Sequence, residues 1–115
     1  MSAEVLAGLN EYLLEDRPER SLGRMLANLG GDVVLCGHTQ LPSHRRIGSV
    51  HLINVGSVGK PKGGDPRACY VPIELDGDVT ATSPRVAYDV KAAARAIEAA
   101  DLPHEFASVL RTGGR

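Results

Sequence analysis

The sequence has 115 residues, the usual size of a single domain, and its 43% hydrophobic and 23% charged residues are far from the composition of disordered chains. Thirteen Lys and Arg against fourteen Asp and Glu give a net charge of -1, without the basic excess that binding to nucleic-acid backbones requires. No apolar run approaches the ~20 residues that span a bilayer and no secretory leader opens the chain, so the expectation is a cytoplasmic protein.

The first segments are predicted to be helical. Ser2 can cap a helix that would carry Val5, Leu6, Leu9 and Leu13 on one face, although residues 11–16 could equally be a loop. A second helix is predicted over 18–29. Its apolar residues recur at helical spacing, Pro18 suits a first turn, and the pair Gly30 and Gly31 can end it.

Three strands are predicted next. The run 33–36 is short, partly β-branched and bounded by glycines, which favours a strand buried on both faces. Two more strands, 44–47 and 50–54, are joined at Gly48-Ser49, and a glycine-rich loop over 56–66 follows. Glycines in such a loop indicate unusual backbone angles or the close approach of a ligand.

The last third of the sequence predicts a hairpin and two helices. From Arg67 the residues Cys69, Val71, Ile73 and Leu75 alternate onto one face, Asp76-Gly77 supplies a tight turn, and a strand of about 78–86 returns, with Pro72 indicating an edge position. Asp89 can cap a helix to about residue 100, Leu102-Pro103 breaks it, and a short helix carries Phe106, Val109 and Leu110. We expect the tail 112–115 to be frayed. Helices and strands together predict an α/β fold in one unit.

Four histidines and two cysteines are the candidates for site chemistry. His38 directly follows the predicted strand 33–36, and open α/β folds place their sites at the carboxyl ends of strands. A metal-ligating role is our interpretation, and a hydrogen-bonded structural histidine is the alternative. His44 and His51 are interpreted as strand surface and His104 as a helix start. Cys36 and Cys69 show no zinc spacing and are interpreted as buried apolar thiols.

Three motifs stand in a fixed order around these residues: Gly37-His38-Thr39-Gln40-Leu41-Pro42, then Asn54-Val55-Gly56-Ser57-Val58-Gly59, then Gly64-Asp65-Pro66-Arg67-Ala68-Cys69-Tyr70. In this order the chain resembles the prokaryotic calcineurin-like metallophosphoesterases. The resemblance implies the carboxy-terminal half of an αββα sandwich, so residues 1–115 would be a partial domain that lacks the amino-terminal metal-binding half.

The resemblance also implies a cofactor. Members of the family hold two divalent cations, which bind the phosphoryl oxygens and supply an attacking hydroxide. His38 matches the first histidine of the family's Gly-His-Thr-His, whereas Gln40 replaces the second, and an amide is a poorer ligand for transition metals. The metal itself stays open among Mn, Fe, Zn, Ni and Mg. The Asp-x-His, Gly-Asp-x-x-Asp and Gly-Asn-His motifs of the family are not in the sequence.

The remaining site residues are expected to shape the site or meet the substrate: Gly37, Thr39, Asn54, Gly56, Ser57 and Arg67, with Lys60 as a further cation. A turn or solvent-facing role is the alternative for each. The implied function is metal-dependent hydrolysis of a phosphomonoester or phosphodiester, absent from this chain alone because a bridging carboxylate is missing. A non-catalytic binding module is the alternative. The expected partners are a phosphate-ester substrate and either the missing amino-terminal half or a second copy of the chain.

Overall fold

The computed structural model of the chain describes residues 18–27 and 30–115, and the helix and the loop expected before Pro18 lie outside these ranges. The described elements run in the order α1 Glu19–Leu26, β1 Val33–Cys36, β2 Ser43–Ile47, β3 Val50–Asn54, β4 Ala68–Cys69, β5 Ile73–Glu74, β6 Thr80–Ala81, β7 Arg85–Val86, α2 Val90–Ala99 and α3 His104–Thr112. The predicted sequence of helix, three strands, hairpin and two helices is confirmed. None of these helices is long and apolar enough to cross a membrane.

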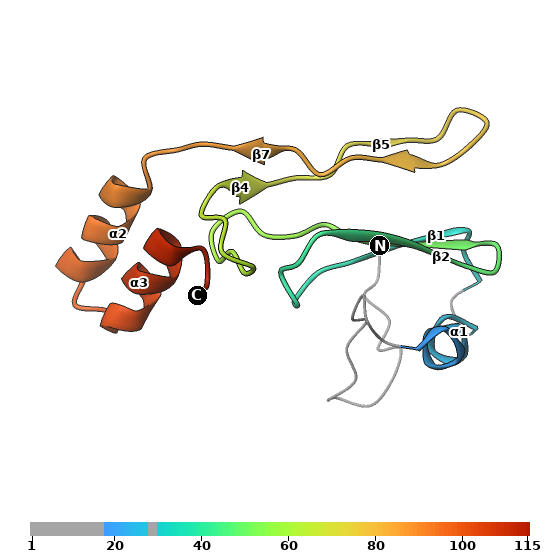
Figure 1. Cartoon of the computed structure of the whole chain (residues 1–115), viewed down its shortest axis with the longest axis horizontal. Helices are drawn as coiled ribbons and strands as arrows, with labels where there is room; N and C mark the ends of the chain where they lie inside the picture. The colour runs from blue at the N-terminus through green and yellow to red at the C-terminus, as the bar shows by residue number, and fades with distance from the viewer. Residues whose placement is uncertain (1–17, 28–29) are drawn as a thin grey trace.

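A three-stranded sheet with the order β1-β3-β2 forms the centre of the molecule. β1 runs parallel to β3, and β2 pairs antiparallel with β3 through the turn at Gly48. Leu22 and Leu26 of α1 pack on Ile47 and Leu52, because the helical spacing of the leucines and the two-residue period of the strands each place apolar side chains on one face. Figure 1 shows α1 on one side of this sheet and the hairpin of residues 68–86 on the other.

The prediction that β1 is buried on both faces was wrong. The Leu35 side chain is 42% exposed, and Val33, Val34 and Cys36 are only partly buried. Among the described residues β1 has one neighbour, β3, and therefore forms an edge of the sheet. Both cysteines were predicted to be buried thiols. The prediction is confirmed for Cys69 but was wrong for Cys36, which is only partly buried. Partial burial still raises the pKa of the Cys36 thiol, because a thiolate is poorly solvated there.

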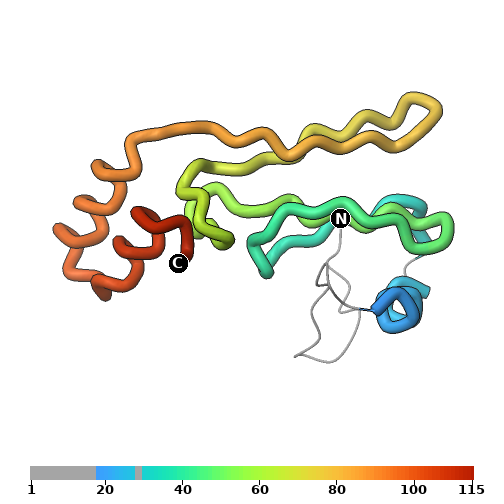
Figure 2. Tube along the Cα trace, viewed as in Figure 1, coloured from blue at the N-terminus to red at the C-terminus, as the bar shows by residue number. Residues whose placement is uncertain are grey.

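The predicted strands 67–75 and 78–86 form one hairpin that is interrupted in the middle. β4 pairs with β7 and β5 with β6, and the two ladders keep a single register across the gap between them. Pro72 and Pro84 lie in that gap, where proline cannot donate to a ladder. The carbonyl of Pro72 still accepts from the Thr82 amide at 3.4 Å. Figure 2 shows the resulting long, thin hairpin extending above the sheet.

The two carboxy-terminal helices form a separate layer at one end of the molecule. The Asp89 side chain accepts from the Ala92 amide at 2.9 Å, which confirms the predicted cap of α2. Ala94, Ala107 and Leu110 are buried between the helices and the rest of the chain, while Phe106 is nearly half exposed. A pair of hydrogen bonds from the Arg111 guanidinium to the Glu98 carboxylate, at 2.6 and 3.0 Å, ties α3 to α2.

The tail after α3 is ordered by contacts with the glycine-rich loop, so the expectation of a frayed tail was wrong. Gly113 ends α3 with φ +70°, and its carbonyl accepts from the Gly64 amide at 2.8 Å. The Thr112 hydroxyl donates to the Ser108 carbonyl. The backbones of the tail and the loop meet so closely that only glycine fits at Gly113, where a Cβ would lie 2.5 Å from Gly64 and Asp65 backbone atoms.

The molecule is more extended than a complete domain of its size. Its radius of gyration is 16.2 Å, against about 13 Å expected for a compact chain of this length. Leu75, which the sequence places on the same face of the hairpin as Cys69, is 70% exposed, whereas Cys69 is fully buried. The apolar face of the hairpin is therefore only partly covered.

We expect Gly113→Ala to lower the free energy of unfolding by about 2–4 kcal/mol, because the new Cβ adds a left-handed backbone penalty and a clash with the loop backbone. Gly77→Ala is the matched control. Gly77 also has a positive φ, +75°, but a Cβ there would meet nothing within 4 Å, so only the backbone penalty of roughly 1–2 kcal/mol applies. Urea unfolding of both variants measures the difference, and equal losses would show that the tail is not docked.

Candidate functional site

The candidate site lies where β1 and β3 end side by side. Cys36 and Asn54 are partners at the carboxyl ends of these parallel strands, and the Val55 amide donates to the Cys36 carbonyl at 3.0 Å just beyond them. The loops 37–40 and 55–57 therefore leave the sheet at one edge. This is the position in which open α/β sheets carry ligands, and it is where the sequence placed His38.

His38 occupies a strained backbone conformation. Its φ is +74°, and the Thr39 amide donates to the Gly37 carbonyl at 2.9 Å across it. This makes His38 the central residue of a γ-turn with positive φ, which is rare. Gln40 also has a positive φ, +67°. Two non-glycine residues in the left-handed region within three positions cost on the order of 1–3 kcal/mol each, and such strain concentrates at functional sites.

Asn54 connects the two loops. Its side chain is 2% exposed, and its Nδ2 donates to the Thr39 Oγ1 at 2.6 Å while its Oδ1 accepts from the Gly56 amide at 3.0 Å. Because an amide N–H must meet an oxygen, the bond from Gly56 also fixes the orientation of the carboxamide. Asn54 thereby holds the loop that carries His38 at a set distance from the loop that carries Ser57.

Gly56 and Ser57 link the sheet to the hairpin. Gly56 has φ +72°, and a Cβ there would lie 3.0 Å from the Cys69 sulfur and 3.3 Å from Pro42, so a larger residue does not fit without movement. The Ser57 carbonyl accepts from the Cys69 amide at 2.9 Å. The Ser57 hydroxyl accepts from the Lys60 amide at 2.8 Å, a turn contact that uses the main chain of Lys60 and leaves its ammonium group exposed.

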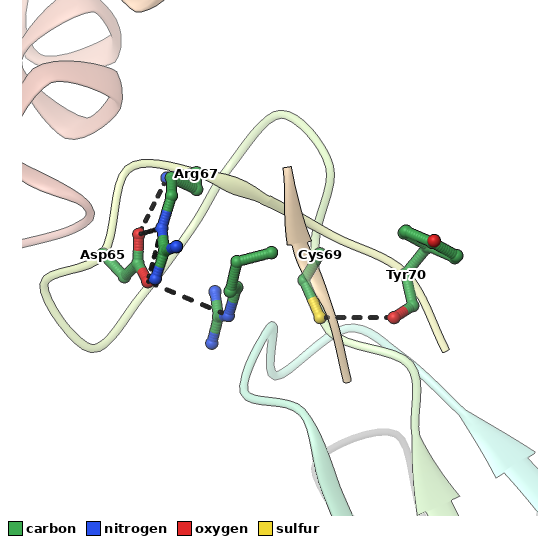
Figure 3. Close-up of polar contacts among 5 residues, drawn as sticks. Asp65, Arg67, Cys69 and Tyr70 are labelled. Atoms are coloured by element: carbon green, nitrogen blue, oxygen red, sulfur yellow. Dashed lines mark hydrogen bonds and ion pairs between the residues drawn. The ribbon is translucent and has the colours of Figure 1, made fainter. Parts of the chain in front are cut away.

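Arg67 is paired with Asp65 in this structure. Its Nε and Nη2 contact the Asp65 carboxylate at 3.1 and 2.8 Å, and the Asp65 Oδ1 also accepts from the Arg67 amide. Arg85 approaches the same carboxylate at 4.0 Å, and Figure 3 shows the contacts between Asp65 and Arg67. The hydrogen bonds from Arg67 are the main cause that lowers the pKa of Asp65 from 3.8 to about 2.

The structure thus brings together Gly37, His38, Thr39, Gln40, Asn54, Gly56 and Ser57 through the two strand ends, whereas Arg67 lies on the next loop with its charge matched by Asp65. His38 and Gln40 remain predicted ligands. In residues 18–27 and 30–115 no three His, Cys, Asp or Glu side chains converge on a point that could hold a metal ion. The described donors therefore do not suffice for the two-cation centre that the resemblance implied.

Two features were not found by reasoning from the sequence. The pairing of Asp65 with Arg67 had a signal in the Asp-Pro-Arg segment, because an aspartate side chain commonly accepts from the main-chain amide two residues further on, as Asp65 does from Arg67. The second is a contact between His44 and His51, whose nitrogens lie 2.9 Å apart. The two-residue turn of the predicted hairpin fixes the register that brings them together.

Comparison with known proteins identifies the family. The model of the calcineurin-like phosphoesterase superfamily domain matches residues 3–78, about two thirds of the chain. The chain therefore belongs to the calcineurin-like phosphoesterase superfamily, as the order of its motifs predicted. No curated protein sequence matches it significantly.

Solved structures confirm the fold. A metallophosphoesterase from Sphaerobacter thermophilus superposes with a TM-score of 0.73 and 26% identity, over 83% of this chain and 47% of that protein. A hypothetical protein from Pyrococcus horikoshii gives a TM-score of 0.79 at 20% identity, over 92% of this chain and 42% of that one. The chain thus has a partial α/β metallophosphoesterase fold and spans less than half the length of both structures.

Replacing Asn54 should weaken the whole site. We expect Asn54→Ala to lower the free energy of unfolding by roughly 2–3 kcal/mol, because it removes two bonds and leaves buried polar groups without partners. The amide resonances of Thr39 and Gly56 should shift in NMR spectra. Thr39→Ser is the control, since it keeps the hydroxyl that accepts from Asn54 and should leave the Gly56 resonance near its original position.

The Asp65 carboxyl should titrate with a midpoint of about 2 in carbon-detected NMR. The pKa of Asp65 is lower in the folded protein than its ordinary value of 3.8, so the ion pair with Arg67 stabilises the folded state fully at pH values above 3.8. This stabilisation is lost as the pH falls from 3.8 toward 2. Arg67→Gln should move the midpoint toward 3.8. Arg85→Gln should move it less, since Arg85 makes only the weakest contribution, and the opposite ranking of the two variants would contradict the assignment.

Proposed function

We propose that this chain supplies the carboxy-terminal half of a metal-dependent phosphoester hydrolase site. The observation that carries the proposal is His38, held at a positive φ at the end of a parallel strand and secured through Thr39 by a buried asparagine. A surface turn without a ligand gains nothing from this strain, because a glycine at the same position would remove it. In the proposed role the strain fixes the direction of one imidazole ligand.

Divalent cations, when bound, would supply electrostatic stabilisation of the phosphoryl oxygens and a more acidic water. Within this chain His38 and Gln40 are the predicted ligands at the strand ends, and two such ligands cannot form the centre by themselves. Carboxylates and further imidazoles must come from other polypeptide. We therefore propose that residues 1–115 alone do not hydrolyse phosphoesters.

The open parts of the fold support a partner polypeptide. In the described part of the chain β1 has a neighbour on one side only, Leu35 and Leu75 are exposed, and the molecule is extended. An unpaired strand edge next to uncovered apolar surface favours association. We propose that the amino-terminal half of the family's domain completes this sheet, and that self-association is the substitute when that half is missing.

The substrate proposed is a phosphate ester, with Lys60 as the cation free to meet it. Arg67 can contribute only by exchanging Asp65 for the phosphate, because its guanidinium is already engaged.

The change from the family's histidine to Gln40 favours a second candidate function, a module that keeps the fold and binds a phosphorylated ligand without turnover. A hydrolase would cleave the bound phosphate ester when a metal is present, whereas a binding module would leave it intact.

The test begins with the DNA directly upstream of the Met1 codon, translated in frame and searched for the family's Asp-x-His, Gly-Asp-x-x-Asp and Gly-Asn-His motifs. If they are found, the longer chain should hydrolyse p-nitrophenyl phosphate or bis-p-nitrophenyl phosphate when Mn²⁺ is added, and residues 1–115 should not. His38→Ala should reduce kcat by at least about 100-fold, since even partners outside the ligand shell cost 10–100-fold. His104→Ala, on α3, should leave kcat unchanged.

Gln40→His in the longer chain separates the two candidates further. If Gln40 occupies a ligand position, restoring an imidazole should raise the affinity for Mn²⁺ or Zn²⁺ and lower the metal concentration needed for half-maximal activity. A stop codon upstream with no such motifs, together with a folded 115-residue protein that binds phosphate esters without hydrolysing them, would instead establish the binding module.

A further inference from the structure

The face of the β2–β3 hairpin turned away from α1 carries a histidine pair. The His44 Nε2 and the His51 Nδ1 lie 2.9 Å apart, with ring centroids 5.2 Å apart and the rings inclined by 44°. The register pairs His51 with Arg46 and His44 with Ile53, so the two histidines are diagonal neighbours on adjacent strands. Both are on the face opposite Ile47 and Leu52, which pack against α1.

From this geometry we propose that His44 and His51 form a bidentate binding site for a transition-metal cation, Cu²⁺ or Ni²⁺ above all. Two imidazole nitrogens bound to one cation at ~2.0–2.1 Å are about 2.9–3.3 Å apart for bond angles between square-planar and tetrahedral. The two nitrogens already lie within that range. Reorientation of the two rings, without movement of the strands, is enough to direct both lone pairs at one cation.

The hydrogen bond between the rings fixes the state from which the cation binds. One nitrogen donates its proton and the other accepts, so at least one ring is neutral. In the neutral pair, binding requires the donor ring to move its proton to its other nitrogen, after which both facing nitrogens have a free lone pair. The proton number does not change, because each imidazole keeps one N–H. Water completes the coordination.

The choice of metal follows from the ligands and the surroundings. When only two imidazoles bind a cation, the choice of metal follows the intrinsic affinity of each ion for nitrogen ligands. Among common divalent ions this affinity is highest for Cu²⁺ and next for Ni²⁺. Arg46 lies directly across from His51, with its Nε bonded to the Gly48 carbonyl at 3.2 Å. Its positive charge opposes the cation, so Arg46→Gln should tighten binding, most clearly at low salt.

The site is separate from the candidate site at the strand ends. All four histidines of the sequence lie in the described residues, and neither His38 nor His104 is part of the pair. His104 begins α3. His104 therefore serves as the matched control, and the inference stands or falls independently of the phosphoesterase proposal.

The experiment is a titration of tag-free protein with CuCl₂, followed by isothermal calorimetry and by pulsed EPR. Wild type should bind one Cu²⁺ with the nitrogen couplings of two imidazoles. His44→Ala and His51→Ala should each weaken binding by at least about 10-fold and leave one imidazole coupling, since each removes one of two protein ligands. Circular dichroism of each variant checks that the sheet is intact, and His44→Gln and His51→Gln serve as milder replacements.

His104→Ala should keep both the affinity and the two-imidazole spectrum. The proposal is overturned if the double variant His44→Ala/His51→Ala binds Cu²⁺ as tightly as wild type, or if His38→Ala abolishes the two-imidazole signal. In either case the copper would be bound elsewhere on the chain.

Discussion

The geometry of the candidate site depends on the buried side chain of Asn54. Its two hydrogen bonds join loops that leave the sheet from different strands, and no other described side chain makes both contacts. The donor to Thr39 reaches the residue that follows His38, so the asparagine opposes relaxation of the γ-turn. The acceptor for Gly56 holds a backbone position that packs against Cys69 and Pro42. One carboxamide thus couples the imidazole loop, the sheet and the hairpin.

Local patterns predicted most of the elements because each is determined by nearby residues. The spacing of Leu22, Met25 and Leu26 predicts α1, the cap Asp89 predicts the start of α2, and the turn at Gly48 sets the register of β2 and β3. His38 was placed correctly at the strand end for the same reason, since a glycine-bounded strand must stop there. The family followed from the order of the motifs and is confirmed by the match over residues 3–78.

The features that the sequence did not reveal depend on distant contacts. Alternation predicted one continuous strand through Val71, but a proline in each strand, Pro72 and Pro84, divides the hairpin while the register persists. The tail 112–115, which contains Gly113 and Gly114, was expected to fray. Those glycines are instead what allows the tail to lie against the loop at Gly64, a contact between residues far apart in sequence. The burial of β1 was overestimated because an apolar run predicts what a strand would bury in a complete sheet, and among the described residues β1 has a neighbour on one side only.

These observations connect the strain at the site with the incompleteness of the fold. A chain that buries little between its layers has little free energy to spare, since even complete domains are marginally stable. It nevertheless holds His38 and Gln40 in conformations that glycine or asparagine would adopt at lower cost. The strain persists because Asn54, Gly56 and the parallel strand ends fix the loop from several directions. A scaffold selected for stability alone would lose such residues first, so their presence in an open half-sandwich favours a site that is completed, and used, together with another polypeptide.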